Sequence, residues 1–463
     1  MNLPPELLQA VAAPGGGKIT LIVGAGCSFE APTSIPLAAT CSQQCHDRLV
    51  ENGVLANGDC NQPWNLSRLA DAVLAKRGHQ RYLVEDLSQH YALKAASPNE
   101  GHLLTAALLG EGAIASVVTL NFDLALSTAI GQLGVGELVG IIDGPDDLQH
   151  QKAINLYYLH RNANAVDPDT WILRTAALTT EWKGKWEAVI TAKVLATPVV
   201  LFAGLGSAAD VLVESSRLIR SAIPNGSRAY QVDPGEPDKS EFFLALGLDH
   251  ASYIQGKWCD FMEVLSQRLV VEQAAKLKTI AVEMIQRDHI TPEDITALTS
   301  RLSEIGLIEV GSLRANWLLH DKRYLAAEAF THELVADLLL GAAFVARVTD
   351  TRAILFGDGL VEFRRGDRTV ATHVFVSGRG TRGRVAIETE LVARQRRFRG
   401  RASPPSGAVV AGIRSDAAAT ITPPADVLLG DTSESIVLGS STLPIFHIDS
   451  LRQEPAKCRQ VAP

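Results

Sequence analysis

Apolar and polar positions along this chain follow two patterns: short runs that are almost continuously apolar, and longer runs with helical periodicity. Residues 18–24, KITLIVG, are almost continuously apolar, which is typical of a strand buried on both faces of a sheet. Helical patterns, KWEAVITAKVLA and ADVLVESSRLIRSAI, lie between later runs of the same kind. Those later strand candidates are ASVVTLNF, INLYYLH, TWILRT, PVVLFAGLG and SRAYQVDP. Strands alternating with helices predict an α/β fold with a parallel sheet covered on both faces.

Two changes in the pattern indicate how the chain is organised. Residues 37–110 have helical periodicity without a strong strand pattern, so we expect a helical insertion packed over the carboxyl edge of a Rossmann-like sheet. From about residue 271 long helices give way to hairpin-like segments with glycine turns. We therefore predict an α/β domain over residues 1–270 and a mixed α+β C-terminal region over residues 271–463.

Composition narrows the class of protein. The 463 residues are 46% hydrophobic, and the mean hydropathy of +0.10 is typical of folded domains. A net charge of −8 argues against a chain whose whole surface binds nucleic acid. No run of about 18 apolar residues predicts a membrane span, and the start MNLPPELLQAVAAPGGGK does not resemble a signal peptide. We expect a cytoplasmic protein that does not bind membranes.

The six cysteines do not predict a disulfide scaffold. Cys41 and Cys45 have helical spacing, with His46 adjacent and Cys60 nearby. These groups can be buried thiols on a helix or zinc ligands. We favour buried thiols and expect no metal.

Two glycine turns follow strand candidates. Gly24-Ala25-Gly26 would let the backbone turn sharply and approach a phosphate at the next helix. Gly204-Leu205-Gly206-Ser207, with Asp210 opening the following helix, repeats this arrangement. Phe29 stands where a dinucleotide fingerprint has its third glycine, and no convincing acidic residue follows about 20 positions later. An ordinary nicotinamide dehydrogenase is therefore disfavoured.

Asn121 and His160 each follow a strand candidate, and both lie between the glycine turns in sequence. Thr119 and Asp123 flank Asn121 at alternate positions. Taken singly, an asparagine there is typical of a turn and a histidine of a satisfied strand end. Together they suit cleavage of the nicotinamide–ribose bond of NAD. An amide can hold ribose hydroxyls or a water molecule, and an imidazole can accept a proton.

These segments resemble the sirtuin superfamily, in particular its bacterial sirtuin-like NAD-hydrolase branch. The similarity extends over roughly residues 15–270 and is carried by several motifs in order. They are GAGCS…IP at 24–36, PNEGH at 98–102, TLNFD at 119–123, YLH at 158–160 and GLGSAAD at 204–210.

The resemblance implies a sirtuin-like NAD-binding catalytic domain. The catalytic residues would be Asn121 and His160, whereas His102 matches a position more structural than catalytic. NAD would be the substrate. The positions expected to bind it are Gly24, Ala25, Gly26, Ser28, Pro36, Thr119, Asp123, Gly204, Gly206, Ser207 and Asp210.

Three departures from deacylating sirtuins separate the possible reactions. The acidic–aromatic–basic run after Ile35-Pro36 is missing, residues 161–257 contain no cysteine for a zinc module, and Arg161 replaces the usual glycine. We therefore predict an NAD glycohydrolase, by resemblance the toxic effector of an antiphage defence system. An NAD-dependent protein deacylase and a non-catalytic scaffold that binds NAD or ADP-ribose remain the alternatives.

An arginine-rich segment, Arg364–Arg401, stands out from the acidic chain. Eleven arginines are opposed by only Asp367, Glu388 and Glu390. The segment can serve assembly, contact nucleic-acid phosphates or be a solvated hairpin, and we favour a homo-oligomer or partner interface, with nucleic acid second. By resemblance, the partner would be a HerA-type ATPase or a short Argonaute.

Overall fold

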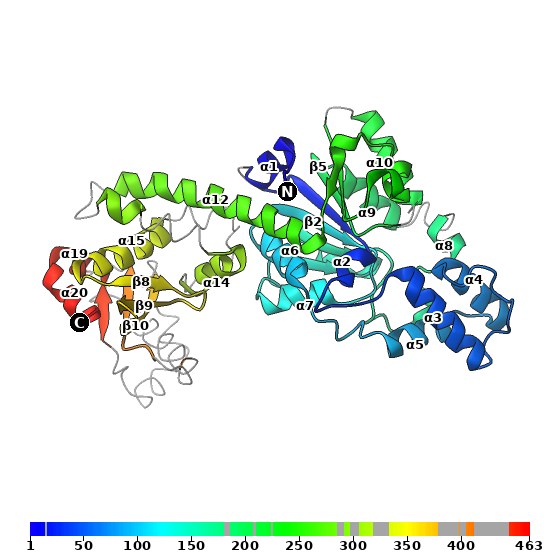
Figure 1. The fold of residues 1–463 in the computed structure, drawn as a ribbon, viewed down its shortest axis with the longest axis horizontal. Helices are drawn as coiled ribbons and strands as arrows, with labels where there is room; N and C mark the ends of the chain where they lie inside the picture. The colour runs from blue at the N-terminus through cyan, green and yellow to red at the C-terminus, as the bar shows by residue number, and fades with distance from the viewer. Residues whose placement is uncertain are drawn as a thin grey trace. The chain divides into compact units, whose positions relative to one another are not determined.

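The computed structural model divides into two compact units, Met1–Leu269 and Val270–Pro463 (Figure 1). Each unit contains its own sheet and is described by itself. The structure describes residues 1–13, 16–179, 186–206, 210–223, 226–284, 291–296, 305–317, 333–377, 398, 404–411 and 444–463.

The described part of the first unit contains a seven-stranded parallel sheet in the order β3-β4-β2-β1-β5-β6-β7. The strands are β1 (Ile19–Val23), β2 (Ile114–Thr119), β3 (Val139–Ile142), β4 (Ile154–Tyr158), β5 (Val199–Ala203), β6 (Arg228–Asp233) and β7 (Tyr253–Gln255). Three strands lie on each side of β1, so the chain reverses direction across the sheet next to it. Such switch points are where open α/β sheets bind ligands. The predicted Rossmann-like α/β fold is confirmed.

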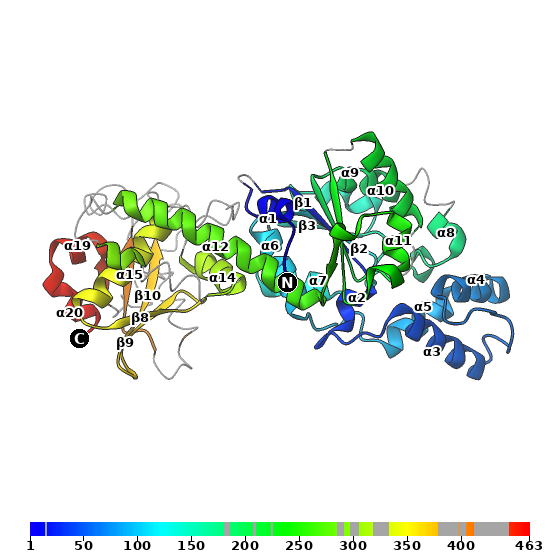
Figure 2. The ribbon, with the colours of Figure 1, turned by 45° about the horizontal axis from the view of Figure 1, so that its top comes forward.

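Helices cover both faces of this sheet. Figure 2 shows α6 and α7 on one side and α9, α10 and α11 on the other. Ile22, Tyr157 and Phe202 of the sheet pack in one core cluster with Val194 of α9 and Phe242 of α11. The helices of the unit include α1 (Pro5–Val11), α2 (Ala25–Phe29), α6 (Glu100–Gly110), α7 (Ala125–Gln132), α9 (Trp186–Leu195), α10 (Asp210–Ala222) and α11 (Glu241–Leu246), and α12 (Trp258–Met284) begins in it.

The helices of residues 37–110 fall into two packing groups. Helices α3 (Ala38–Glu51), α4 (Leu66–Arg77) and α5 (Arg81–His90) share a core that also buries Cys41, Cys45 and Cys60. Helix α6 instead contacts α7 and β2 of the sheet. Among the described residues, no group of three or more His, Cys, Asp or Glu side chains is placed to hold a metal ion.

The expected strand at TWILRT is wrong. Thr170 ends a short 3-10 helix (Pro168–Thr170), and residues 171–174 form a loop that ends at α8 (Thr175–Thr179). Trp171 and Leu173 are buried in the core of the α3–α5 group. The Gln80 amide donates hydrogen bonds to the carbonyls of Pro168 and Trp171, at 3.0 and 2.7 Å, which satisfies backbone groups that a sheet would otherwise pair.

The second unit contains a mixed sheet in the order β12-β11-β10-β9-β8. Strand β9 is antiparallel to β8 and β10, whereas β10, β11 and β12 are parallel. This part of the expected α+β architecture is confirmed. The described elements of this unit include α14 (Leu307–Trp317), α15 (Glu333–Val348), β8 (Arg352–Leu355), β9 (Leu360–Arg365), β10 (Arg368–Ser377), β11 (Gly407–Ala411), β12 (Ile445–His447), α19 (Ile448–Gln453) and α20 (Cys458–Val461).

Most of the arginine-rich segment lies outside the described residues. Arg364 and Arg365 are on β9, where Arg364 pairs with Glu362 and Arg365 donates to the Thr349 carbonyl at 3.1 Å. Positions 378–397 and 399–403 are the ones outside the described residues. Within the described chain, no helix has both the length and the apolar character needed to cross a membrane.

Candidate functional site at the carboxyl edge of the first sheet

The register of the sheet aligns the segments that follow β4, β2, β1 and β5. Thr119 pairs with both Val23 and Tyr158, and Val23 also pairs with Ala203. Because the strands are parallel, the next residues of all four emerge at the same edge. Asn121 and His160 are each two residues beyond this aligned row, on neighbouring strands.

The two glycine turns pack directly against each other. Gly24 donates its N–H to the Ala203 carbonyl at 2.9 Å, and Gly26 donates to the Gly204 carbonyl at 3.0 Å. Gly204 has a left-handed φ of 66°. A Cβ at Gly204 would lie 2.5 Å from the Cys27 nitrogen, and one at Gly26 would lie 2.7 Å from the Gly204 Cα. The close contact between the turns therefore leaves no room for a side chain at Gly26 or Gly204.

This contact changes how the first turn is interpreted. The N–H groups of Gly24 and Gly26 already bind carbonyl oxygens, so they are not the donors for a phosphate in this arrangement. Among the described residues, no atom would lie within 4 Å of a Cβ added at Gly206. Of the turn glycines, Gly206 is therefore the one whose missing side chain no described neighbour explains. The NAD-binding roles assigned to the turns stay predictions.

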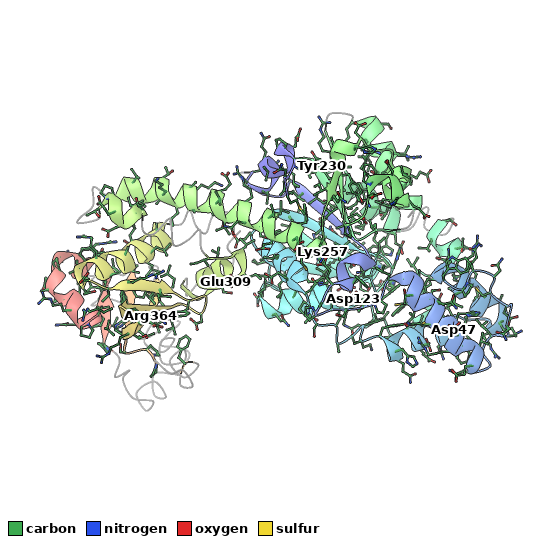
Figure 3. The ribbon with its side chains drawn as sticks, in the orientation of Figure 1. Asp47, Asp123, Tyr230, Lys257, Glu309 and Arg364 are labelled. Atoms are coloured by element: carbon green, nitrogen blue, oxygen red, sulfur yellow. The ribbon has the colours of Figure 1, made fainter. Side chains whose placement is uncertain are left out.

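A buried hydrogen-bond network connects the first turn to the segment after β2. The Ser28 hydroxyl donates to Asp123 Oδ2 at 2.8 Å and accepts from Asn121 Nδ2 at 3.1 Å. Asn121 Nδ2 also donates to the Gly24 carbonyl at 3.1 Å. Figure 3 marks Asp123 beside α2, the helix that carries Ser28. Sequence positions 93–97 residues apart thus form one site.

This network fixes the orientation of the Asn121 amide. An amide nitrogen has two hydrogens, and here they are directed to Gly24 O and Ser28 Oγ. A flipped amide would place two acceptors against each other at Gly24, so the assignment is consistent with its surroundings. The backbone N–H of Asn121 donates to the Thr119 hydroxyl at 3.1 Å. Asn121 therefore has Oδ1 as the acceptor it can offer a ligand or water.

Asp123 stabilises this network through both of its carboxyl oxygens. Its Oδ1 accepts from the Ala125 N–H, at the start of α7, at 3.0 Å. Burial raises the pKa of the Asp123 carboxyl, and its hydrogen bonds with Ser28 and Ala125 oppose that rise. The carboxyl group connects the start of α7 to Ser28. We interpret Asp123 as a residue that positions Ser28 and Asn121.

His160 is a neutral imidazole at physiological pH. Burial lowers its pKa to about 4, and a backbone hydrogen bond involving Leu120 partly opposes this. Its ring centroid lies 6.3 Å from that of Phe122, and its carbonyl accepts from the Ile172 N–H at 3.2 Å. The neutral ring retains a nitrogen that can accept a proton.

Arg161 adopts the conformation usually left to glycine. Its φ is 72°, in the left-handed region that disfavours side chains with a Cβ. The guanidinium donates to the Asp143 carbonyl, and a Cβ at Gly144 would lie 1.7 Å from Arg161 Nη1. The turn therefore accommodates an arginine at this position, and Gly144 makes room for its side chain.

Other predicted positions lie around this centre. The Pro36 carbonyl accepts from the Cys41 thiol at 3.2 Å near the start of α3, and no hydrogen bond between described residues joins it to the Asn121 network. Ser207 lies outside the described residues. Asp210 begins α10, but nothing is described of its side chain.

His102 caps α6: its Nδ1 accepts from the Asn99 N–H at 3.3 Å, and burial lowers its pKa to about 4.

Asn99 is a site-supporting residue that the sequence interpretation missed. Its Nδ2 donates to the carbonyls of Cys27 and Glu30, at 2.8 and 3.2 Å, while its Oδ1 caps α6 through the His102 N–H. It therefore ties α6 to the segment carrying Ser28. The PNEGH segment contained a signal for this role, because asparagine before a helix is a common N-cap.

Comparison with known proteins gives structural similarities only. No family model matches the chain, and no curated protein matches it. The chain is similar to the structure of a Sir2 homologue–NAD complex, with 14% identity and a TM-score of 0.35, covering 57% of this chain and 93% of that one. It is also similar to a complex of Sir2 with a peptide and NAD+, with 14% identity and a TM-score of 0.34, covering 58% and 98% of the two chains.

Proposed function

We propose that the carboxyl edge of the first sheet binds NAD and transfers its ADP-ribosyl group to water. The observation that carries this proposal is the placement of Asn121 and His160 at equivalent positions beyond neighbouring strands, beside two packed glycine turns. Asn121 offers an oriented acceptor, and His160 offers a neutral imidazole. These are the two groups that the reaction requires from the protein.

The proposed reaction breaks the bond between ribose C1′ and the nicotinamide nitrogen. The bonding electrons leave with nicotinamide, which becomes neutral, while positive charge develops on the ribose. Water attacks C1′ and loses a proton, giving ADP-ribose. Asn121 Oδ1 accepts a hydrogen bond from that water or from a ribose hydroxyl, and His160 accepts a proton.

The first experiment measures nicotinamide release from NAD by the full chain. Asn121→Ala and His160→Ala should each reduce turnover by about a hundredfold or more, because each removes a group that acts on the reacting atoms. The mechanism is wrong if both variants retain the wild-type rate. NAD loss that requires an acetyl-lysine peptide would favour a deacylase instead, and tight NAD binding without cleavage under any activating condition would favour a scaffold.

The biological role belongs to the same proposal. In this view the chain is an antiphage effector that remains inactive until a trigger or partner opens the site. In bacteria carrying the protein and its genomic neighbour, phage infection should lower cellular NAD, and Asn121→Ala should abolish this loss. An unchanged NAD loss in the variant would separate the role from this site.

Assembly is proposed to regulate access to the site. The arginine-rich segment would join copies of the chain or bind a partner of the HerA-type ATPase or short Argonaute kind. Its eleven arginines support this proposal, because they concentrate positive charge in an otherwise acidic chain.

A further inference from the structure

A pocket lies in the segment that follows His160. Its volume is about 450 Å³, within the range of roughly 300–1,000 Å³ typical of small-molecule sites. None of the described residues of the glycine turns or of the Ser28–Asn121–Asp123 network is among those that line it. The lining residues that matter here are Arg161, Trp171, Ile172, Arg174, Trp186 and Glu187.

Three buried polar atoms on these walls have no hydrogen-bond partner in the described structure. They are Glu187 Oε2 and the indole Nε1 atoms of Trp171 and Trp186. Glu187 is 4% exposed and Trp171 is 3% exposed, so bulk water does not readily replace the missing partners. Buried polar groups are normally satisfied. One acceptor and two donors on residues that line the pocket therefore lack a partner among the described residues.

The pocket also carries groups that recognise anions and planar rings. Arg161 and Arg174 contribute guanidinium groups, which suit phosphate oxygens. The indole rings of Trp171 and Trp186 provide flat apolar surface. A nucleoside phosphate combines the matching features: a phosphate for the arginines, and a planar base with N–H donors for Glu187 and acceptors for the indoles.

The pocket wall is in contact with the surroundings of His160. Trp171 is stacked on Phe122, with ring centroids 4.3 Å apart and planes within 6°, and Phe122 lies 6.3 Å from the His160 ring. The Ile172 N–H donates to the His160 carbonyl at 3.2 Å. A ligand that moves Trp171 or Ile172 thus acts on the ring and backbone of His160.

We propose that this pocket is a second ligand site, which binds a nucleoside phosphate and adjusts the position of His160. The regulatory part rests on the proposed function of His160, whereas the binding part does not. Each part therefore has its own measurement.

The binding experiment uses the full-length Asn121→Ala variant with saturating NAD, so that the proposed substrate site is filled and cleavage is suppressed. AMP, GMP and UMP are titrated by calorimetry. At least one should bind with one molecule per chain, and adding Trp186→Phe or Glu187→Gln should weaken it by about tenfold, since the first removes an N–H donor and the second replaces an acceptor oxygen by a donor. Val189→Ala, an exposed position on the same helix, should leave binding unchanged.

Two results would overturn the second site. One is the absence of binding by all three nucleotides. The other is complete displacement of the nucleotide by NAD, which would make the pocket an extension of the substrate site. Two hydrogen-bonding variants are used because either alone can disturb α9, and circular dichroism checks the fold of each.

The coupling experiment reads the His160 ring directly. In histidine-labelled protein, the nucleotide should shift the imidazole NMR signal that His160→Gln removes, and Phe122→Leu should reduce this shift while binding persists. An unchanged His160 signal at full occupancy would disprove the coupling. This result stands whether or not the protein cleaves NAD, so failure of the coupling and failure of the proposed function are distinguishable.

Discussion

At the scale of single residues, the hydrogen bonds of the Asn121 amide nitrogen determine the structural role of this side chain. An asparagine after a strand is usually a turn former, and the sequence alone allowed that role. The hydrogen bonds to Gly24 and Ser28 instead make Asn121 part of a rigid buried network. Such support keeps Oδ1 in place without a ligand, which is the kind of preorganisation that catalysis needs.

Asn155 provides a matched control for Asn121. It is also a buried asparagine of the first unit, but it lies within β4 and its side chain binds the backbone of Lys152. Asn121→Ala and Asn155→Ala should each lower the free energy of unfolding by about 1–3 kcal/mol, because each leaves buried partners unsatisfied. Only Asn121→Ala should abolish nicotinamide release. Denaturant unfolding and the NAD assay together check this, and equal turnover losses would reduce Asn121 to a structural residue.

The lowered pKa of His160 predicts two pH dependences. The imidazole is already neutral above about pH 5, so kcat/KM for NAD should be flat from pH 6 to pH 8. An acid limb near pH 6.5 that disappears in a residually active His160→Gln variant would contradict this prediction.

His160 should make the folded protein less stable as the pH falls. A histidine whose charged form is stabilised by folding would have the opposite effect. Unfolded histidine titrates near pH 6.5, whereas folded His160 titrates at about 4, so the unfolded chain binds more protons between these values. Stability should therefore fall as the pH is lowered through this window. His160→Gln should make that fall shallower in guanidinium unfolding at pH 7, 6 and 5. An unchanged slope would show that burial does not hold the ring neutral.

At the scale of elements, contact between the turns after β1 and β5 determines the shape of the site. The sequence showed two glycine turns, and either could have been an ordinary strand–helix connection. Their adjacency follows from the pairing of β1 with β5, which joins segments about 180 residues apart. Only this pairing explains why a side chain is excluded at Gly24, Gly26 and Gly204.

Glycine substitutions separate the effects of backbone conformation and close packing. Gly204 and Gly134 have nearly equal φ angles, 66° and 68°, but only Gly204 has atoms near its missing Cβ. Gly134→Ala should cost about 1–2 kcal/mol from conformation alone, and Gly204→Ala should cost more because the turns must separate. Thermal unfolding checks this order. Equal losses would mean that the turn contact is unimportant.

Gly206→Ala tests the ligand role of the second turn. No atom of the described part of the chain lies within 4 Å of its added Cβ, so the variant should remain as stable as the wild type. If the backbone at Gly206 approaches a phosphate of NAD, the variant should raise KM for NAD about tenfold with a smaller effect on kcat. An unchanged KM would place the phosphate elsewhere.

At the scale of the whole molecule, the prediction concerns the arginine-rich segment. Reversing Arg396, Arg397 and Arg399 to glutamate should change the elution volume or abolish partner capture, because the local excess of positive charge would be lost. A control with the same charge change uses three exposed cations of the first unit: Arg68, Arg81 and Lys94. Unchanged oligomeric state and partner binding in the segment variant would reject the assembly role.

The sequence by itself determined the α/β class, the positions of most strands along the chain and the segments that carry Asn121, His160 and the glycine turns. These features are local, because periodicity and strand-end glycines can be read in short windows. It missed β3, which has four residues including a glycine, and β7, which has three residues, and it wrongly assigned a strand to TWILRT. Apolar runs as short as TWILRT do not reveal whether a segment pairs in a sheet or enters another core.

Only the tertiary structure decided how the candidate site is constructed. Strand register brings Asn121 and His160 to one edge, and hydrogen bonds between distant residues orient the Asn121 amide. The left-handed Arg161 and the pocket beside it also depend on Gly144, Trp171 and Glu187, which no local pattern connects. The physical reason is that propensity acts between neighbours in sequence, whereas burial and hydrogen bonding act between neighbours in space.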